Sequence, residues 1–380
     1  MDQIYKLPDT NQDRFDEDPE LSYTMPARLY WDPQVLDEER RQIFHKSWIC
    51  VAHRSELTEP GSYVTADILG QRVFAIRGRD HELRAFYNVC QHRGHALLEG
   101  RGRAKNVITC PYHAWAYDYD GALKAARLCD DVKEFDKSDF SIPAVRVQEF
   151  AGFVYVNLDA NAETIEALNH GLEDELRRFC PAIDELKPAC EVVFDIKGNW
   201  KNVGDNLLEC YHCSPSHKAF VDLVDMNTYS VHTFDNWSVQ HGSCRPANSA
   251  YNFPEGEAGA CEPFSTAFMW PALGFTTFPG AAGIATFSFL PLEPELTHQV
   301  LTYYSQDGKL NETEQAVIDY FNNVLGPEDV GLVESVQQGL RSYGYHQGRF
   351  VIDSKRSHTS EHAVHHFHSL AMKALGRWDV

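Results

Sequence analysis

Two cysteine–histidine pairs stand close together in the first third of the sequence. Cys90 and His92 form a Cys-x-His pair, and Cys110 and His113 form a Cys-x-x-His pair that begins after a gap of 17 residues. A 2Fe–2S cluster with two Cys on one iron and two His on the other needs such a set. Its neutral imidazoles raise the reduction potential above that of an all-Cys cluster. These four residues therefore predict a 2Fe–2S site.

A zinc site with two Cys and two His is the alternative for the same residues. Zinc fingers usually pair Cys with Cys and His with His at wider spacing, so a Cys-x-His pair suits that class poorly. Gly94 and Pro111 would let the two loops turn tightly around a cluster. His95 has no spacing that suits a ligand, and we assign it to the surroundings of the site.

One carboxylate and two histidines form a second group in the segment 199–220. Glu209 and His212 are three residues apart and would share one face of a helix. Pro215 is expected to end that helix and to let His217 turn back toward His212. Two His and one carboxylate with open positions are the ligand set of non-haem Fe(II) oxygenases. Spacing alone makes Glu209 the carboxylate ligand.

Cys210 and Cys213 are interleaved with this second group and have the spacing of a zinc or redox pair. On a helix both side chains would point away from His212, and no partner pair is nearby, so we assign them no metal role. The chain has 10 cysteines and 18 histidines. In a reducing cytoplasm these are expected to be thiols and metal ligands rather than disulfides.

Hydrophobic periodicity indicates the elements that must position both groups. Expected strands are 73–76, 86–89, 107–110, 153–158, 284–291 and 299–304. Expected helices are 38–48, 162–179, 312–324 and 330–342. The predicted fold class is α+β, with a small antiparallel β domain inserted in a larger α+β domain. The predicted bounds are 1–45 for the N-terminal segment of the catalytic domain, 46–160 for the cluster domain and 161–380 for the catalytic mononuclear iron domain.

Composition and charge exclude several classes of partner. The chain has 380 residues, 43% of them hydrophobic, and a formal net charge of −21. Nucleic acid and anionic membranes are unsuitable partners for so acidic a molecule. No apolar run approaches the roughly 20 residues of a membrane helix. Residues 1–20 lack the basic and apolar regions of a secretory signal, so we expect a cytoplasmic protein that binds no membrane.

With these motifs, the sequence resembles the large (alpha) oxygenase subunit of Rieske non-haem iron oxygenases. The resemblance runs from Trp48 to the C-terminal segment SEHAVHHFH, and it is strongest to the branch that acts on quaternary ammonium compounds such as carnitine and betaine. It implies a helix-grip-like α+β catalytic domain. The stretches that carry it are MPARLY, KSWICVAH, LRAFYNVC, KNVITCPYHAWAY, EFAGFVYVNLD, LLECYHC and GPEDVGLVESVQQGL.

This resemblance changes the assignment of the carboxylates. It implies that His212, His217 and Asp329 hold the mononuclear iron, although Asp329 alone indicates only an acidic helix start stabilised by the helix dipole. Should Asp329 not be the ligand, Asp205 is the next candidate. Glu209 is implied as a catalytic residue that bridges a cluster histidine of the neighbouring subunit to an iron histidine. Spacing and resemblance therefore disagree about Glu209.

The implied function is that of a terminal oxygenase with one Rieske 2Fe–2S cluster and one mononuclear Fe(II). Electrons would come from NAD(P)H only indirectly, through a reductase component with flavin and a 2Fe–2S cluster, and the chain would form a homotrimer. The small-molecule substrate would be a carnitine- or betaine-like quaternary ammonium compound, hydroxylated next to nitrogen with C–N cleavage. One alternative is an oxygenase that hydroxylates or demethylates an aromatic compound. A Rieske ferredoxin or a zinc-stabilised binding protein is the other, and the length argues against a ferredoxin.

Several residues bear on the substrate. Gln91, Ser216 and Leu207 depart from what relatives commonly have, and Leu207 stands where close relatives tend to have Tyr. Aromatic rings can hold a cation, although each ring can equally pack in a core. The aromatic stretch in question comprises Phe264, Phe268, Trp270, Phe275 and Phe278.

Overall fold

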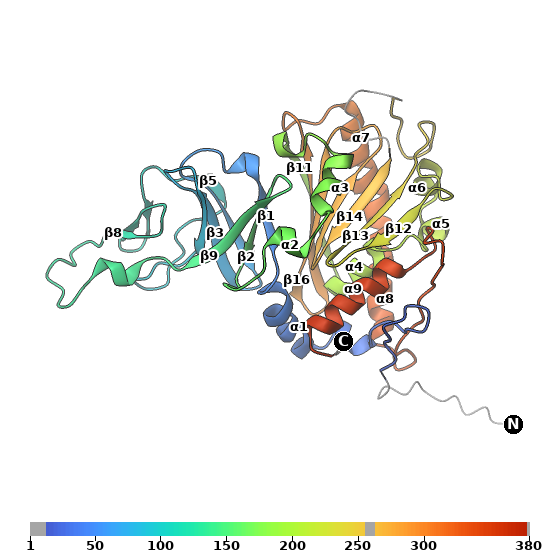
Figure 1. Ribbon diagram of the computed structural model, residues 1–380, viewed down its shortest axis with the longest axis horizontal. Helices are drawn as coiled ribbons and strands as arrows, with labels where there is room; N and C mark the ends of the chain where they lie inside the picture. Colours follow the sequence, from blue (N-terminus) through green and yellow to red (C-terminus); the bar gives the residue numbers. More distant parts are fainter. Residues whose placement is uncertain (1–12, 255–262, 378–380) are drawn as a thin grey trace. The chain divides into compact units, whose positions relative to one another are not determined.

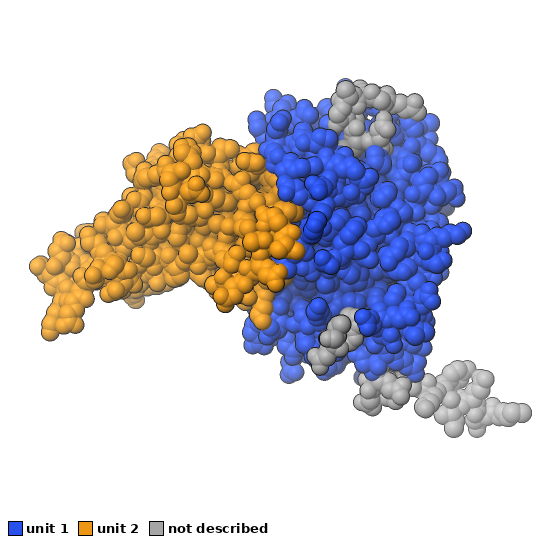
Figure 2. All heavy atoms as spheres, viewed as in Figure 1, with its two compact units in different colours: residues 1–43, 168–380 blue, residues 44–167 orange. Residues whose placement is uncertain are grey.

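The computed structural model describes residues 13–254 and 263–377. Two compact units make up the chain: unit 1 comprises residues 1–43 and 168–380, and unit 2 comprises residues 44–167 (Figures 1 and 2). The first twelve residues of the predicted N-terminal segment lie outside the described residues. Each unit is built on its own antiparallel sheet, so the predicted α+β class with a separate β domain is confirmed.

Unit 2 contains a seven-stranded sheet with the order β1-β10-β9-β4-β3-β2-β5. Its strands are β1 (Ile49–His53), β2 (Ser62–Ile68), β3 (Gln71–Arg77), β4 (Leu83–Tyr87), β5 (Arg101–Arg103), β9 (Ala144–Phe150) and β10 (Phe153–Asn157). A three-stranded sheet comprises β6 (Ile108–Thr109), β7 (Ala116–Tyr117) and β8 (Leu123–Ala125). One apolar cluster contains Phe74 and Ile76 of the large sheet together with Tyr117 of the small one. The two sheets therefore share a core, which includes Cys90 and Cys110.

Unit 1 contains the second seven-stranded sheet, with the order β11-β17-β16-β15-β14-β13-β12. Its strands are β11 (Lys187–Ile196), β12 (Ser230–Thr233), β13 (Trp237–Gly242), β14 (Phe264–Met269), β15 (Leu273–Thr277), β16 (Ile284–Glu293) and β17 (Leu296–Ser305). Helix α4 (Trp200–Leu207) packs against β16 and β17. Helices α8 (Gly326–Leu340) and α9 (His362–Ala374) pack against α4 (Figure 1). Helix α4, which leads into the predicted iron segment, is thus in contact with the sheet, with α8 and with α9.

The remaining helices are short. They are α1 (Pro33–Glu39), α2 (Ile165–Leu168), α3 (Leu172–Phe179), α5 (Cys213–Ser216), α6 (Lys218–Leu223) and α7 (Glu312–Tyr320), with π turns at Arg40–Phe44 and Phe321–Leu325. The helix predicted at 38–48 begins earlier, because Asp32 caps α1 by accepting from the Gln34 N–H and a proline follows it. The helix predicted at 162–179 is two helices, because Gly171 takes a φ of +85° before α3.

A buried ion pair fixes the start of α4. Lys201 and Glu39 are both fully buried, and the Lys201 ammonium bonds to the Glu39 carboxylate. Trp200 Nε1 donates to the same carboxylate over 2.8 Å. Burial lowers the pKa of Lys201, although Glu39 opposes this effect. Removing one partner would leave an uncompensated charge, at a cost of about 3–5 kcal/mol. Within the described residues, no helix combines the length and apolar character needed to cross a membrane.

Candidate metal centres

The two Cys–His pairs of unit 2 lie on loops with the same backbone pattern. Cys90 N–H donates to His95 O over 2.8 Å, and Cys110 N–H donates to Trp115 O over 2.8 Å. The residue four after each cysteine, Gly94 or Ala114, donates back to the cysteine carbonyl. Both of these residues have positive φ, +75° and +59°. The paired spacing in the sequence thus corresponds to two equivalent turns.

The four predicted cluster ligands are close together. Cys90 and Cys110 are buried free thiols, and the ring centroids of His92 and His113 are 4.5 Å apart. His113 Nδ1 is buried without a hydrogen-bond partner among the described residues. A buried ring nitrogen without a partner, beside a second imidazole and two thiols, is what an iron–sulfur cluster would satisfy. The residues present therefore fit the cluster that the sequence predicts.

Neighbouring groups tune this site. The Tyr117 hydroxyl lies 3.3 Å from Cys90 Sγ and can donate to it. Burial raises the pKa of Cys110, and the adjacent Cys90 thiol raises it further. His92 stacks on Trp115 with ring centroids 4.8 Å apart, yet its side chain is exposed, and Tyr112 is 54% exposed. The histidine side of the site therefore faces the surface, where an electron donor or acceptor can approach.

In unit 1, His212, His217 and Asp329 form a group whose potential ligand atoms all lie within 4.8 Å of one another. His217 Nε2 is 2.9 Å from Asp329 Oδ1, and His212 Nε2 is 3.5 Å from the same oxygen. The two imidazole rings are nearly perpendicular, at 84°. Asn206 Nδ2 donates to Asp329 Oδ1 over 3.2 Å. Two His and one carboxylate converging on one point suit a facial Fe(II) site with open positions.

A glutamate contacts the Nδ1 atom of each histidine. Glu209 Oε1 bonds to His212 Nδ1, and Glu209 Oε2 accepts from the His212 N–H over 3.0 Å. Glu328 Oε2 lies 2.8 Å from His217 Nδ1. Both histidines therefore turn Nε2 toward Asp329, and such carboxylate partners orient metal-binding imidazoles. Sequence reasoning misses Glu328, whose one signal is the Glu–Asp pair at the start of α8.

Glu209 and Asp205, the other candidate carboxylates, lie outside this group. Glu209 is on the Nδ1 side of His212, away from Asp329. Asp205 accepts from the Tyr30 hydroxyl over 2.7 Å and from His368 Nε2 over 2.8 Å. The Met25 N–H donates to His368 Nδ1, which leaves the ring proton on Nε2. Asp205 therefore serves to tie α4 to the N-terminal segment and to α9.

The segment that carries the histidines differs from the predicted helix. Helix α4 ends at Leu207, so Glu209 and His212 lie in the turn that follows and do not share a helix face. Pro215 does not end a helix: it lies in the first turn of α5, where no backbone N–H is needed. The chain turns instead at His217, with φ −117° and ψ 73°.

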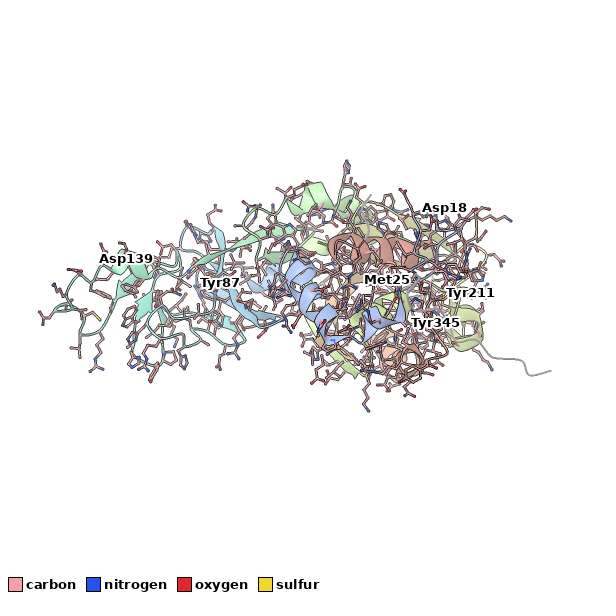
Figure 3. The ribbon with its side chains drawn as sticks, turned by 90° about the horizontal axis from the view of Figure 1, so that it is seen from below. Asp18, Met25, Tyr87, Asp139, Tyr211 and Tyr345 are labelled. Carbon is pink, nitrogen blue, oxygen red and sulfur yellow. A yellow bond between two sulfur atoms is a disulfide. The ribbon has the colours of Figure 1, made fainter. Side chains whose placement is uncertain are left out.

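Cys210 and Cys213 form a disulfide in the structure, which overturns the expectation of free thiols at these positions. Their Cα atoms are 4.9 Å apart. Because these residues span a turn rather than a helix, their side chains face each other. Tyr211, between them, is 49% exposed and lies at the edge of unit 1 (Figure 3).

The electrostatics of the group favour a divalent cation. Burial alone would lower the pKa of His212, but hydrogen bonds with Asp329 and Glu209 raise it to about 10. Burial also lowers the pKa of His217, but Asp329 raises it by more, so the pKa of His217 lies above its usual value. Burial raises the pKa of Asp329, yet the two histidines hold it below its usual value. The protons that these histidines retain are those a metal ion would displace.

A pocket opens beside the group. Leu207 and Asp329 are among its lining residues, as are Gln240, Thr266, Thr276 and Gln299. Two members of the predicted aromatic stretch, Phe264 and Phe278, line it, whereas Phe268 and Trp270 pack against Phe367. The aromatic rings that line the pocket are Phe220, Tyr229, Phe264, Phe278, Phe287 and Phe321.

Comparison with known proteins gives two family matches. Residues 47–136 match the Rieske [2Fe-2S] domain, and residues 183–376 match the ring hydroxylating alpha subunit (catalytic domain). The chain is 43% identical to the carnitine monooxygenase oxygenase subunit of Escherichia coli (strain K12), over 94% of this chain and 95% of that one. It is 28% identical to the chloroplastic choline monooxygenase of Spinacia oleracea, over 94% and 79%.

A solved structure extends this likeness to three dimensions. A quaternary ammonium Rieske monooxygenase in complex with L-carnitine superposes with a TM-score of 0.86 at 41% identity, over 98% of this chain and 99% of that one. The matched families imply a Rieske cluster and a non-haem iron, and the chain has groups that fit both. The chain therefore belongs to the Rieske non-haem iron oxygenases, as a ring-hydroxylating alpha subunit.

Proposed function

We propose that this chain is the terminal oxygenase component that hydroxylates a quaternary ammonium compound, carnitine- or betaine-like, at a carbon next to nitrogen. The observation that supports this most directly is the pocket beside His212, His217 and Asp329. Six aromatic rings line it, and its described lining contains no Lys or Arg. A quaternary ammonium group binds well against aromatic faces and poorly beside another cation.

The proposal assigns one 2Fe–2S cluster to Cys90, His92, Cys110 and His113, and one mononuclear Fe(II) to the His–His–Asp group. When bound, the cluster would supply electrons and the iron would activate dioxygen. Glu209 and Glu328 would keep each histidine's Nε2 directed at the metal, and Asn206 would hold the carboxylate. The surrounding rings would exclude water and orient the substrate cation.

Hydroxylation next to a quaternary nitrogen leads to C–N cleavage. The hydroxylated carbon loses its hydroxyl proton and forms a carbonyl, while the C–N bond electrons leave with the nitrogen. The products are a tertiary amine and an aldehyde. The tertiary amine is therefore a product that hydroxylation of an aromatic ring would not give.

The histidine side of the cluster site in unit 2 is exposed, which supports a role for electron-transfer partners that bind there. Electrons from NAD(P)H would arrive through a reductase that carries flavin and a 2Fe–2S cluster. In a closed ring of three subunits, the cluster of one chain would lie beside Glu209 of the next. Each Glu209 oxygen makes one bond to His212 and has lone-pair capacity for another donor. A neighbour's cluster imidazole could therefore donate to it.

Oxygen uptake with a generic reductase tests this function. Candidate substrates are carnitine, betaines, choline and a few aromatic acids, with release of a tertiary amine measured in parallel. We expect oxygen consumption coupled to amine release for at least one quaternary ammonium compound. Coupled turnover of an aromatic acid, with no amine from any quaternary compound, would contradict the proposal.

A further inference from the structure

Two threonines on the sheet side of the unit 1 pocket take no part in either metal centre. Thr266 in β14 and Thr276 in β15 both line the pocket. Resting on the proposed function, we infer that this pair determines specificity by donating a hydrogen bond to an acceptor oxygen at the end of the substrate away from the ammonium group. In a carnitine- or betaine-like compound that oxygen belongs to a carboxylate.

The register of the sheet places the two threonines side by side. Thr266 pairs directly with Thr276 across β14 and β15, and their hydroxyl oxygens are 3.0 Å apart. Successive side chains of a strand point to opposite faces, so Thr266 shares its face with Phe264. In the same way, Thr276 shares the face of Phe278. Both phenylalanines also line the pocket, with ring centroids 6.1 Å apart, so the hydroxyl pair lies beside aromatic rings.

One hydroxyl hydrogen of the pair has no acceptor among the described residues. Each hydroxyl carries one hydrogen, and the contact between Thr266 and Thr276 uses one of the two. Both residues are buried, with 4% and 2% of their surface exposed. A buried donor without an acceptor is destabilising. Because both residues line the pocket, an acceptor bound there can reach the remaining hydrogen.

The polar neighbour in the next strand is already bound elsewhere. Gln240 pairs with Thr266 across β13 and β14. Its Oε1 accepts from the Tyr229 hydroxyl over 3.1 Å, and its Nε2 donates to the Leu207 carbonyl over 3.0 Å. The hydrogens of Tyr229 and the amide of Gln240 are therefore engaged within the protein, whereas the threonine pair still has one to donate.

Sheet stability alone gives no reason for hydroxyl groups at these positions. A Thr–Thr contact across two strands stabilises a sheet, but valine has nearly the same shape and suits strands equally well. Two valines among the aromatic rings would also avoid the unsatisfied hydrogen. A carboxylate is a charged acceptor, and hydrogen bonds to charged groups are stronger than those between neutral groups. The pair therefore suits the carboxylate end of a betaine.

Replacing both threonines by valine tests the inference. The double variant of Thr266→Val and Thr276→Val keeps the shape of the pair and leaves no unpaired hydroxyl, so it should fold. Either single variant would leave one hydroxyl able to donate. Two ligands share the trimethylammonium head and the chain length: γ-butyrobetaine ends in a carboxylate, and butyltrimethylammonium ends in a methyl group.

The dissociation constants of both ligands are measured by calorimetry on the holoenzyme. We expect the double variant to bind γ-butyrobetaine about tenfold more weakly than wild type does, or weaker still, because a hydrogen bond to a charged group is lost. Binding of butyltrimethylammonium should not change, because its methyl group accepts no hydrogen bond. This difference between the ligands separates a contact with the substrate from a general effect on the pocket.

Thr277→Val is the matched control. Thr277 follows Thr276 in β15 and is equally buried, but its side chain points to the opposite face and is not part of the pocket lining. Its hydroxyl has no hydrogen-bond partner among the described residues. We therefore expect both dissociation constants to stay as in wild type. If this variant weakened γ-butyrobetaine as much as the double variant does, the effect would come from the sheet and the inference would be wrong.

The remaining outcomes separate the inference from the proposed function. Equal weakening of both ligands in the double variant would show that the threonines only shape the pocket. Unchanged binding of γ-butyrobetaine would assign the contact to another lining residue such as Gln299. Either result overturns the inference and leaves the proposed function in place. If neither ligand binds to the wild-type enzyme, the proposed function fails and the inference fails with it.

Discussion

The two candidate metal centres are built in opposite ways. All four residues of the cluster site lie in one continuous stretch of unit 2, on two loops with the same hydrogen bonds. The site in unit 1 combines a turn after α4 with Asp329 at the start of α8, more than one hundred residues later. A site whose residues come from one local motif can be recognised by spacing. A site completed by a distant residue depends on the packing of α8 against α4.

Cys90→Ala should have the largest effect, because it removes a thiolate that no neighbour can replace. We expect loss of the visible and EPR signals of the cluster, with iron falling from about three atoms per chain to about one. His95→Ala is the matched control, since His95 lies on the same loop and its ring nitrogen contacts the Ala96 carbonyl. A full cluster spectrum in Cys90→Ala would refute the assignment.

Asp329→Ala should remove the metal of unit 1 and leave the cluster of unit 2 in place. The 2Fe–2S signals should persist while the mononuclear iron is lost, because two imidazoles alone hold Fe(II) weakly. Metal analysis beside the EPR spectrum separates the two losses. Asp205→Asn is the control: it should keep the mononuclear iron, since Asp205 is bonded to Tyr30 and His368. The opposite pattern would make Asp205 the ligand.

Glu328→Gln should have a smaller effect at the same site. The amide can still contact His217 Nδ1 but cannot accept a charge-assisted bond. We expect the affinity for Fe(II) to fall about 10- to 100-fold, the usual range for partners of metal ligands. A chelator titration measures this. An unchanged affinity would show that Glu328 does not orient His217.

Glu361→Gln should leave both metal centres unchanged and alter only the pH dependence of stability. Burial, with Glu209 and Asp205 nearby, raises the pKa of Glu361 to about 7. The folded chain therefore binds a proton more tightly than the unfolded chain. Stability from this group is complete below about pH 4.5 and declines as the pH rises through 7, by about 3 kcal/mol. Compared with wild type, the variant should have a higher Tm at pH 8 and a similar Tm at pH 5; equal Tm values at both would contradict this account.

These differences explain what the sequence can predict. The cluster residues follow from local spacing, and strands of the same unit such as β3 and β10 follow from short apolar runs. Asp329 could be assigned only through resemblance, because an acidic residue at a helix start has an ordinary structural explanation. Glu328 could not be predicted, because it reaches His217 across a sequence separation of 111 residues. The Cys210–Cys213 disulfide could not be predicted, because it depends on α4 ending at Leu207.

The most direct test concerns Glu209, where spacing and resemblance disagree. Glu209→Gln is analysed for metal content, and its pre-reduced cluster is then followed in a single turnover with substrate and dioxygen. Because Glu209 contacts His212 on the side away from Asp329, we predict that both metals remain and that cluster oxidation nearly stops. Loss of the mononuclear iron would show that Glu209 is a ligand, and a normal rate of cluster oxidation would contradict any role for it in electron transfer.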